Sequence, residues 1–196
     1  LFPYTTLFRS DQLESTAAKY KGQNLDLIVF GCTSGSFIKG IGWDQECIKR
    51  IETASGSPGL TTSTAVMEAL KALEAKTVAV LTPYPDATNE AERQFLENNG
   101  IHVANIAGMD MSGVPGGRIP DAEKPFLYRN SKAMDLKGAD VFFLSCMALD
   151  TLSFVGALET DLGLPVITSH QATLWSALRH CGVRTRQPEL GKLFMI

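Results

Sequence analysis

Short apolar runs alternate with longer stretches of helical spacing along this sequence, and this alternation is what most constrains its fold. Residues 25–30 form a nearly continuous apolar run that ends at Gly31, a pattern typical of a parallel strand covered on both faces. Four further runs have the same character: Thr77–Leu81, Ile101–Ile106, Ala139–Leu144 and Leu164–Thr168. Strands and helices in alternation predict βαβ units, and therefore an α/β fold of mainly parallel sheets flanked by helices.

The stretches between the runs have the apolar periodicity of amphipathic helices. They are Trp43–Ala54, Ser63–Glu74, Asp86–Asn99, Lys124–Leu136, Asp150–Leu162 and Gln171–Cys181. One connection, residues 107–120, is long and rich in Gly and Pro, so we interpret it as a mobile cover over the site or as a linker. In folds of this kind ligands bind at the carboxyl ends of the strands.

Composition narrows the classes of function. With 196 residues, 44% of them hydrophobic, the chain can bury a core. A formal charge of -3, with 18 basic and 21 acidic residues interspersed, provides no basic stripe, so we expect no nucleic-acid partner. No apolar run approaches the roughly 20 residues of a membrane-spanning helix, so we expect a cytoplasmic protein with no membrane partner.

Neither a metal nor a nucleotide cofactor is expected. The four cysteines, at positions 32, 47, 146 and 181, are too widely spaced for a zinc site and too few for a disulfide scaffold. The glycines of residues 31–36 match neither the phosphate-loop pattern nor the dinucleotide fingerprint. The sequence therefore predicts free thiols and a chemistry carried by the chain's own side chains.

An internal repeat draws attention to two of the cysteines. Residues 25–32 and 139–146 both consist of an apolar strand, a small residue and then a cysteine, Cys32 or Cys146. Farther along, residues 56–62 resemble residues 163–169. A duplicated half-domain explains this pattern, and it predicts two similar lobes related by a pseudo-twofold axis, with the two cysteines facing each other across one crevice.

Two thiols on opposite sides of a substrate suit two kinds of chemistry. One thiol can remove a proton while the other delivers one, or one can add to a carbon while the other protonates its neighbour. Cys32 is followed by Thr-Ser-Gly-Ser, where backbone N–H groups at a helix start can stabilise an anion or hold a carboxylate. The alternative for either cysteine alone is a small buried apolar side chain, which is also our interpretation of Cys47 and Cys181.

From Phe30-Gly31-Cys32-Thr33-Ser34-Gly35-Ser36-Phe37 onward, the sequence resembles the maleate cis-trans isomerase and arylmalonate decarboxylase family, within the aspartate/glutamate racemase superfamily. Further similar segments are residues 61–65, Thr82-Pro83-Tyr84 with Asn89, residues 144–146 and residues 165–175. The resemblance extends from about Leu25 to Phe194. It implies two racemase-like lobes and an enzyme that works without a cofactor.

The resemblance also implies residue roles. Cys32 and Cys146 are the expected catalytic pair, as in isomerases and racemases of this group, whereas the decarboxylases have only the second cysteine. The expected substrate-binding residues are Thr33, Ser34, Tyr84, Asn89, Ser145 and Met147. The implied substrate is a small carboxylate or dicarboxylate, maleate first, and a homodimer fits this class of protein. In a maleate isomerase Cys32 would add to the alkene and Cys146 would protonate the neighbouring carbon.

Two departures leave alternatives open. After the second cysteine this chain has Met147-Ala148-Leu149, whereas the isomerases typically have a polar run there and the decarboxylases a glycine pair. The apolar Met147 puts a dicarboxylate substrate in question. Residues 1–10 resemble no part of the family, so we expect a non-native segment in place of the first strand of the N-terminal lobe, with residues 11–196 as the catalytic domain. The alternatives are an arylmalonate-type decarboxylase and an inactive truncated or binding protein.

Overall fold

The computed structural model describes residues 11–196; the expected non-native segment, residues 1–10, lies outside the described residues. Within them the fold is α/β, as predicted, and every strand pairing is parallel. The strands are β1 (Ile28–Phe30), β2 (Gly59–Thr61), β3 (Thr77–Thr82), β4 (His102–Gly108), β5 (Val141–Leu144) and β6 (Val166–Thr168). The helices are α2 (Leu13–Ala17), α3 (Thr33–Phe37), α4 (Trp43–Ser55), α5 (Thr62–Ala72), α6 (Asp86–Asn98), α7 (Lys124–Lys132), α8 (Val155–Leu162) and α9 (Ser169–His180).

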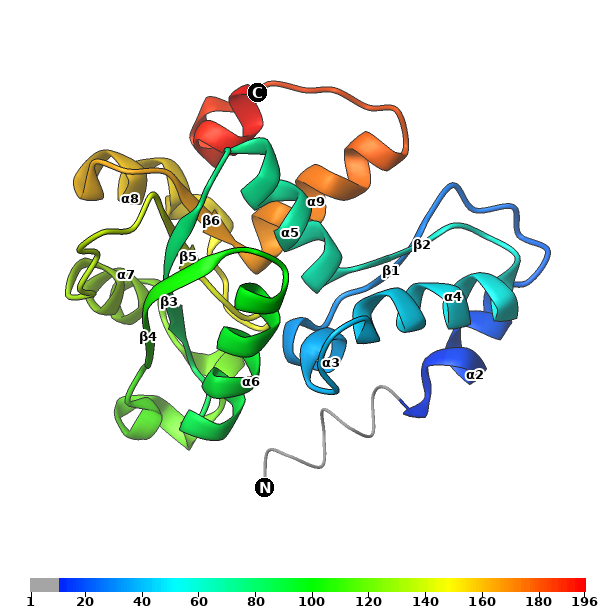
Figure 1. The fold of residues 1–196 in the computed structure, drawn as a ribbon, viewed down its shortest axis with the longest axis horizontal. Coiled ribbons are helices and arrows are strands. Elements are labelled where there is room, and N and C mark those ends of the chain that lie inside the picture. Colours follow the sequence, from blue (N-terminus) through cyan, green and yellow to red (C-terminus); the bar gives the residue numbers. More distant parts are fainter. Residues whose placement is uncertain (1–10) are drawn as a thin grey trace.

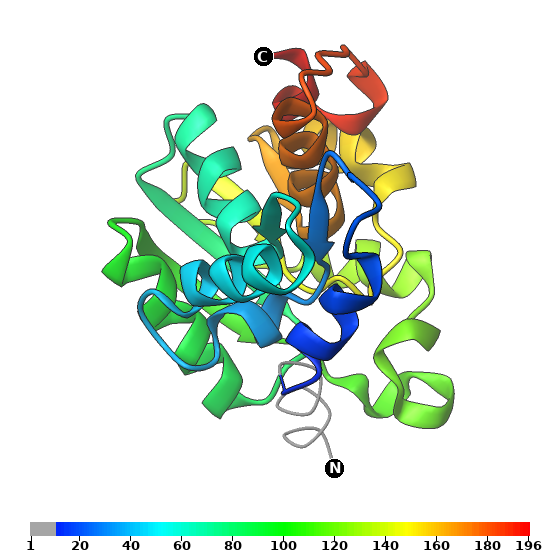
Figure 2. The same cartoon turned by 90° about the vertical axis from the view of Figure 1, so that its right-hand side faces the viewer.

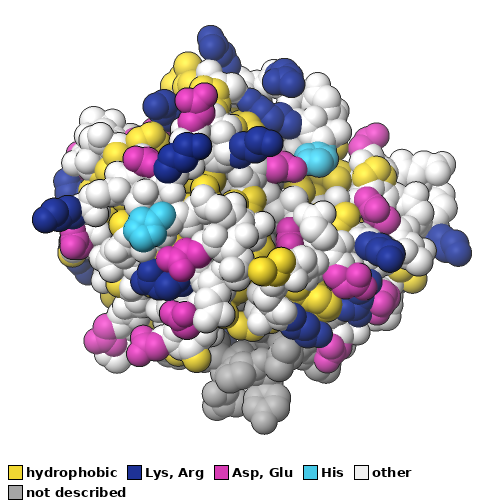
Figure 3. Space-filling view, in the orientation of Figure 1, with side chains coloured by type: hydrophobic (Ala, Val, Ile, Leu, Met, Phe, Trp, Pro, Cys, Tyr) yellow, Lys and Arg dark blue, Asp and Glu magenta, His cyan; other side chains and the backbone are white. Residues whose placement is uncertain are grey.

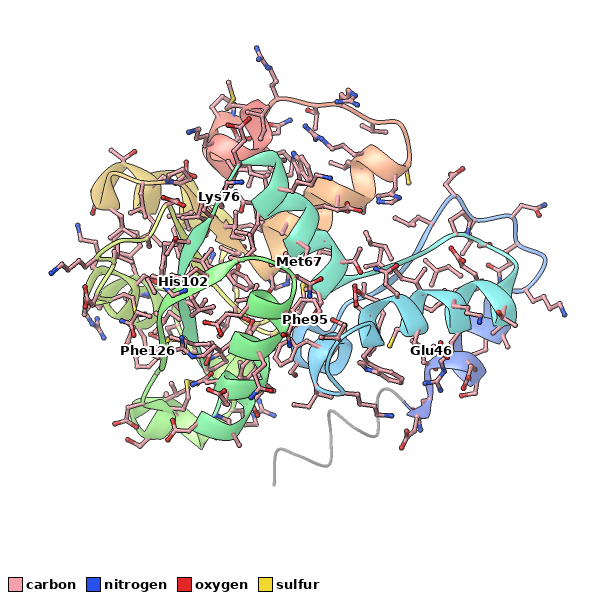
Figure 4. All side chains as sticks on the ribbon, in the orientation of Figure 1. Glu46, Met67, Lys76, Phe95, His102 and Phe126 are labelled. Carbon is pink, nitrogen blue, oxygen red and sulfur yellow. The ribbon has the colours of Figure 1, made fainter. Side chains whose placement is uncertain are left out.

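The strands form two separate sheets (Figure 1). β1 and β2 form a two-stranded sheet beside α2, α3 and α4, while the order β4-β3-β5-β6 forms a four-stranded sheet. Helices α5 and α9 pack against each other between the two sheets. Figure 2 shows the smaller sheet, β1 and β2, in front of them. The two halves meet along these helices and along α3 and α6, where the rings of Phe37 and Phe95 lie 6.2 Å apart. Figure 4 labels Phe95 of α6.

Side chains alternate across the central strand of the larger sheet. Val141 and Phe143 of β5 belong to the apolar cluster under α5, α6 and α9, whereas Phe142 and Leu144 belong to the cluster under α7 and α8. Because successive side chains of a strand point to opposite faces, this sheet is buried on both sides. A third, smaller cluster, which includes Leu13, joins α2 and α4 below β1.

The two cysteine-bearing strands have matching surroundings. β1 pairs with β2 so that Phe30 lies opposite Thr61, and β5 pairs with β6 so that Leu144 lies opposite Thr168. Each threonine then caps the following helix by accepting a backbone N–H three residues on, a standard N-terminal stabilisation. The repeated sequence pattern therefore folds into repeated local structure, which places both cysteines at carboxyl ends of strands.

Several predicted boundaries are wrong for identifiable local reasons. β1 begins at Ile28, because its partner β2 follows Pro58, which has no N–H to donate to a ladder. α7 ends at Lys132 because Asp135 accepts the backbone N–H of Lys137 and forms a turn. The helix expected from residue 150 is divided into a 3₁₀ turn at 152–154 and α8.

The Gly- and Pro-rich connection is not a linker. Residues 111–121 form three consecutive 3₁₀ turns between β4 and α7. Met109 and Val114 are buried in the same apolar cluster as Cys146, so the segment is a packed part of the fold. Arg118, on its outer side, pairs with Asp121 in an exposed ion pair.

Candidate active site

Cys32 and Cys146 occupy equivalent positions at the carboxyl ends of β1 and β5. Cys32 lies two residues beyond β1 and caps the amino end of α3 in an extended conformation. Cys146 lies two residues beyond β5 and has a φ of 134°, a conformation that is costly for any residue with a side chain. A strained backbone at a cysteine beside a strand end is typical of a functional position.

The two thiols differ in exposure. Cys32 is half-buried, whereas Cys146 is 7% exposed. Burial raises the pKa of the Cys146 thiol to about 11, and hydrogen bonding by the Tyr84 hydroxyl partly opposes this rise. A negative charge on Cys32 raises the pKa of Cys146 further. At neutral pH Cys146 is therefore a protonated thiol, suited to donating a proton.

Ser169 joins the two cysteine loops. Its hydroxyl oxygen accepts a hydrogen bond from the Thr33 hydroxyl at 2.9 Å and another from the backbone N–H of Cys146 at 3.0 Å. Ser169 and Thr33 are both buried. The first residue of α3 and the strained cysteine of the larger sheet are thus fixed to one oxygen atom.

A buried network holds the loop that carries Tyr84. The Thr82 hydroxyl donates to Asn89 Oδ1 at 2.6 Å and accepts the backbone N–H of Tyr84 at 2.9 Å. Asn89 in turn donates to the Tyr84 carbonyl at 3.3 Å. Asn89 is 5% exposed, and both its amide oxygen and its amide nitrogen make hydrogen bonds to residues of the Tyr84 loop. Its side chain therefore holds this loop.

The remaining expected substrate-binding residues lie around these groups. Ser34 is on the buried first turn of α3, and its hydroxyl has no protein partner among the described residues. Met147 lies against Gly31, and its sulfur accepts a weak hydrogen bond from Thr173 at 3.7 Å. Ser145 is fully buried, and its hydroxyl donates to Glu92 at 2.5 Å.

Three residues of this region, Ser169, Thr173 and Glu92, were not among the expected site residues. Ser169 could have been recognised from the sequence, because it is the last residue of segment 163–169, which resembles residues 56–62, and because it follows a predicted strand. Thr173 follows one helical turn later on the same helix. Glu92 could not have been recognised, because a glutamate in a helix is ordinarily a solvent-facing residue.

Other features of the described residues are placed away from this site. Cys47 is fully buried against α2, and burial raises the pKa of its thiol to about 11; Cys181 is exposed. A groove of about 320 Å³ runs along β1 between α2 and Ile51 and contains neither thiol of the pair.

Residues 11–196 contain no group of three or more His, Cys, Asp or Glu side chains arranged as metal ligands. None of the described helices is long and apolar enough to cross a membrane. On the face shown in Figure 3, basic and acidic side chains are interspersed.

Comparison with known proteins agrees with this fold. The family model for arylmalonate decarboxylase matches residues 6–194. Arylmalonate decarboxylase of Bordetella bronchiseptica is 31% identical over 181 residues, which cover 91% of this chain and 75% of that enzyme. Maleate isomerase of Pseudomonas putida is 26% identical over 184 residues, which cover 90% of this chain and 72% of that enzyme.

A solved structure of arylmalonate decarboxylase resembles the chain in three dimensions. In that variant one glycine is replaced by cysteine and one cysteine by serine, and the protein is in a liganded form. Its TM-score is 0.78 at 29% identity, over 94% of this chain and 79% of that one. The chain belongs to the family of arylmalonate decarboxylases and maleate cis-trans isomerases. It is therefore an enzyme of the isomerase and lyase type found in this family.

Proposed function

We propose that this protein is a cofactor-independent isomerase or racemase of a small carboxylate that uses Cys32 and Cys146 together, with conversion of maleate to fumarate as the leading reaction. The observation that carries the proposal is the pairing of the two thiols. They come from equivalent strand ends in the two sheets, and the Ser169 hydroxyl joins the loop of Cys146 to Thr33, the residue after Cys32. Two separately held thiols are what addition at one carbon and protonation at the next require.

The two cysteines have different roles in this reaction. The Cys32 thiolate adds to one alkene carbon, and the Cys146 thiol gives its proton to the neighbouring carbon. The central bond is then single and rotates. The Cys146 thiolate takes a proton back from its carbon, the double bond re-forms in the trans arrangement, and Cys32 leaves as thiolate. The raised pKa of Cys146 suits it to begin as the proton donor.

Polar groups near the thiols are candidates for binding the carboxylates. The N–H groups of Thr33 and Ser34 begin α3 beside Cys32, and they precede the first helical hydrogen bond, which Ser36 donates to Cys32. The Ser34 hydroxyl adds a free donor, and the Tyr84 hydroxyl lies beside Cys146. We assign carboxylate binding to Thr33, Ser34 and Tyr84, with Asn89 holding the Tyr84 loop.

The first cysteine separates this chain from the decarboxylases. In the decarboxylase variant described above, the replaced glycine and the replaced cysteine are as far apart in sequence as Cys32 and Cys146 are here. This equal spacing supports the interpretation that a natural arylmalonate decarboxylase has glycine where this chain has Cys32. A thiol on each side of the substrate favours isomerisation over decarboxylation.

One observation favours the decarboxylase as the second candidate. Met147, directly after Cys146, is apolar and lies against Gly31 and Thr173, where an aryl group is better accommodated than a second carboxylate. In that reaction a substituted malonate loses carbon dioxide, and Cys146 protonates the resulting enediolate. Cys32 then takes no part in bond making.

A turnover screen on the wild type, Cys32→Ala and Cys146→Ala separates these functions. With maleate, we expect fumarate formation by the wild type and a loss of at least about 100-fold in kcat for each variant. Release of carbon dioxide from phenylmalonate that survives Cys32→Ala but not Cys146→Ala would favour the decarboxylase. No turnover of any small carboxylate, with both thiols unreactive toward iodoacetamide at pH 9, would indicate a binding protein. Cys181→Ala is the matched control, because its thiol lies outside the site.

A further inference from the structure

Glu92 places a carboxyl group in the interior, next to the residue that precedes Cys146. It lies on the inner face of α6 and is 1% exposed. Its Oε1 accepts the Ser145 hydroxyl at 2.5 Å, while its Oε2 is buried with no hydrogen-bond partner among the described residues. An apolar side chain would fill this position at lower cost, since burying an unpartnered polar atom is unfavourable.

Ser145 directly precedes Cys146, whose backbone conformation is strained, and it is held by two hydrogen bonds. Its backbone N–H donates to the Leu81 carbonyl at 2.9 Å, and its hydroxyl is held by Glu92. The next residue, Cys146, has the φ of 134°, and its N–H is held by Ser169. A strained conformation persists only where its surroundings fix it from several sides. Glu92 provides one of these fixed points.

We propose that Glu92 is a positioning residue for Cys146: its carboxyl group anchors the Ser145 hydroxyl and so holds the adjacent cysteine in its strained conformation. The anchoring of Ser145 by Glu92 does not depend on the proposed function. Only the effect of this anchoring on catalysis rests on the proposed function. The side chain acts through Ser145 and does not itself touch the reacting atoms.

The charge state of Glu92 also affects the pKa values of the groups in the site. Burial raises the pKa of this carboxyl group to about 8, so it is neutral at pH 7. The titratable groups that face it are Tyr84 and Cys146, and a negative charge on Glu92 raises the pKa of both. A negative charge on Cys32 also raises the pKa of both groups. Neutral Glu92 therefore anchors Ser145 without opposing formation of the Cys146 thiolate, and ionised Glu92 opposes it.

The test measures the alkylation rate of Cys146 by iodoacetamide, resolved by peptide mass spectrometry, in the wild type, Glu92→Gln and Glu92→Leu. Exposed Cys181 in the same molecules is the internal reference. Leucine removes the anchor, so Cys146 loosens and becomes alkylated about tenfold faster at pH 7, an effect equivalent to the loss of one net hydrogen bond. Glutamine keeps an acceptor for Ser145, so its rate at pH 7 stays within about twofold of the wild type.

At pH 9 the glutamine variant is expected to react faster at Cys146 than the wild type, because only the wild type carries a charge at position 92. Thermal unfolding checks that Glu92→Leu is folded. If it is not, the double variant Glu92→Leu with Ser145→Ala, which removes both polar partners, takes its place. Equal alkylation rates in all variants at both pH values would overturn the proposal. None of these measurements needs a substrate, so a failure of the proposed isomerase activity would leave the result interpretable.

Discussion

The backbone N–H of Cys146 donates to the Ser169 hydroxyl at 3.0 Å, and the same oxygen accepts the Thr33 hydroxyl. One serine at the start of α9 thus connects the loop of the second cysteine to the helix that follows the first. Because all three residues are buried, the connection is shielded from competition by water. The relative position of the two thiols depends on this contact.

Replacing this serine tests that dependence. Ser169→Ala leaves the buried N–H of Cys146 and the Thr33 hydroxyl without their acceptor, so we expect a loss of about 2 kcal/mol in the free energy of unfolding. Turnover should fall by at least about tenfold, because misplaced reacting groups are costly. Urea denaturation and kcat measure the two effects. Ser15→Ala, at an exposed position of α2, is the control and should change neither quantity. Wild-type turnover in Ser169→Ala would show that the connection is dispensable.

Gly35 controls the space around the first thiol. A Cβ atom added there would lie 2.9 Å from the Cys32 sulfur and 3.0 Å from the Phe30 ring. We expect Gly35→Ala to displace the Cys32 thiol and to reduce kcat by about 10- to 100-fold, with a loss of about 1 to 3 kcal/mol in stability. Gly113→Ala is the matched control, because its added Cβ meets open space. An active Gly35→Ala enzyme would mean that the Cys32 position is not critical.

Tyr84 lowers the pKa of the second thiol against the larger effect of burial. Its hydroxyl stabilises the Cys146 thiolate and so lowers the pKa that burial raises. Tyr84→Phe removes this hydrogen bond, so the pH at which Cys146 becomes reactive toward iodoacetamide should shift upward. The pH profile of alkylation at this cysteine measures the shift, with exposed Tyr20→Phe as the control. An unchanged or downward-shifted profile would contradict the assigned role.

The ionisation of Glu92 links stability to pH. In the folded protein its pKa is raised from 4.5 to about 8, so the folded state holds a proton that the unfolded state has released between these values. The stabilising contribution is therefore complete below about pH 4.5 and is lost as the pH rises through 8, about 5 kcal/mol in all. Glutamine at position 92 does not titrate, so the wild type should lose more stability than Glu92→Gln between pH 5.5 and 8.5 in urea titrations. Parallel pH dependences would show that Glu92 titrates normally.

Much of the fold follows from apolar periodicity. The five predicted strands are all present, because β3, β5 and β6 are buried on both faces and read as continuous apolar runs. β2 was not predicted as a separate strand, since Gly59–Thr61 is short and is fixed by its register with β1. Helices α2 and α3 have five residues each, too few for their periodicity to be recognised.

The site is only partly visible in the sequence. The internal repeat indicated both cysteines, because equivalent segments of a duplicated chain fold alike. The orientation of the Ser145 hydroxyl toward Glu92 was not predictable, because it depends on α6 packing across the end of β5, a contact between residues far apart in sequence. The resemblance placed Asn89 among the substrate-binding residues, and in the structure its amide holds the Tyr84 loop through local contacts with Thr82 and Tyr84.

The most direct test of the two-cysteine account is to trap the addition at the first thiol. Cys146→Ser removes the thiolate that takes the proton back, so once the serine hydroxyl or water has slowly protonated the neighbouring carbon the adduct cannot collapse. After incubation with maleate we therefore predict a stable adduct with the mass of one maleic acid on the Cys32 peptide, seen by mass spectrometry. Competition by a small dicarboxylate such as malonate should slow its formation, while exposed Cys181 should show no such competition. An enzyme that carries the adduct at Cys181 alone, or that converts maleate to fumarate with Cys32 replaced by alanine, would contradict the account.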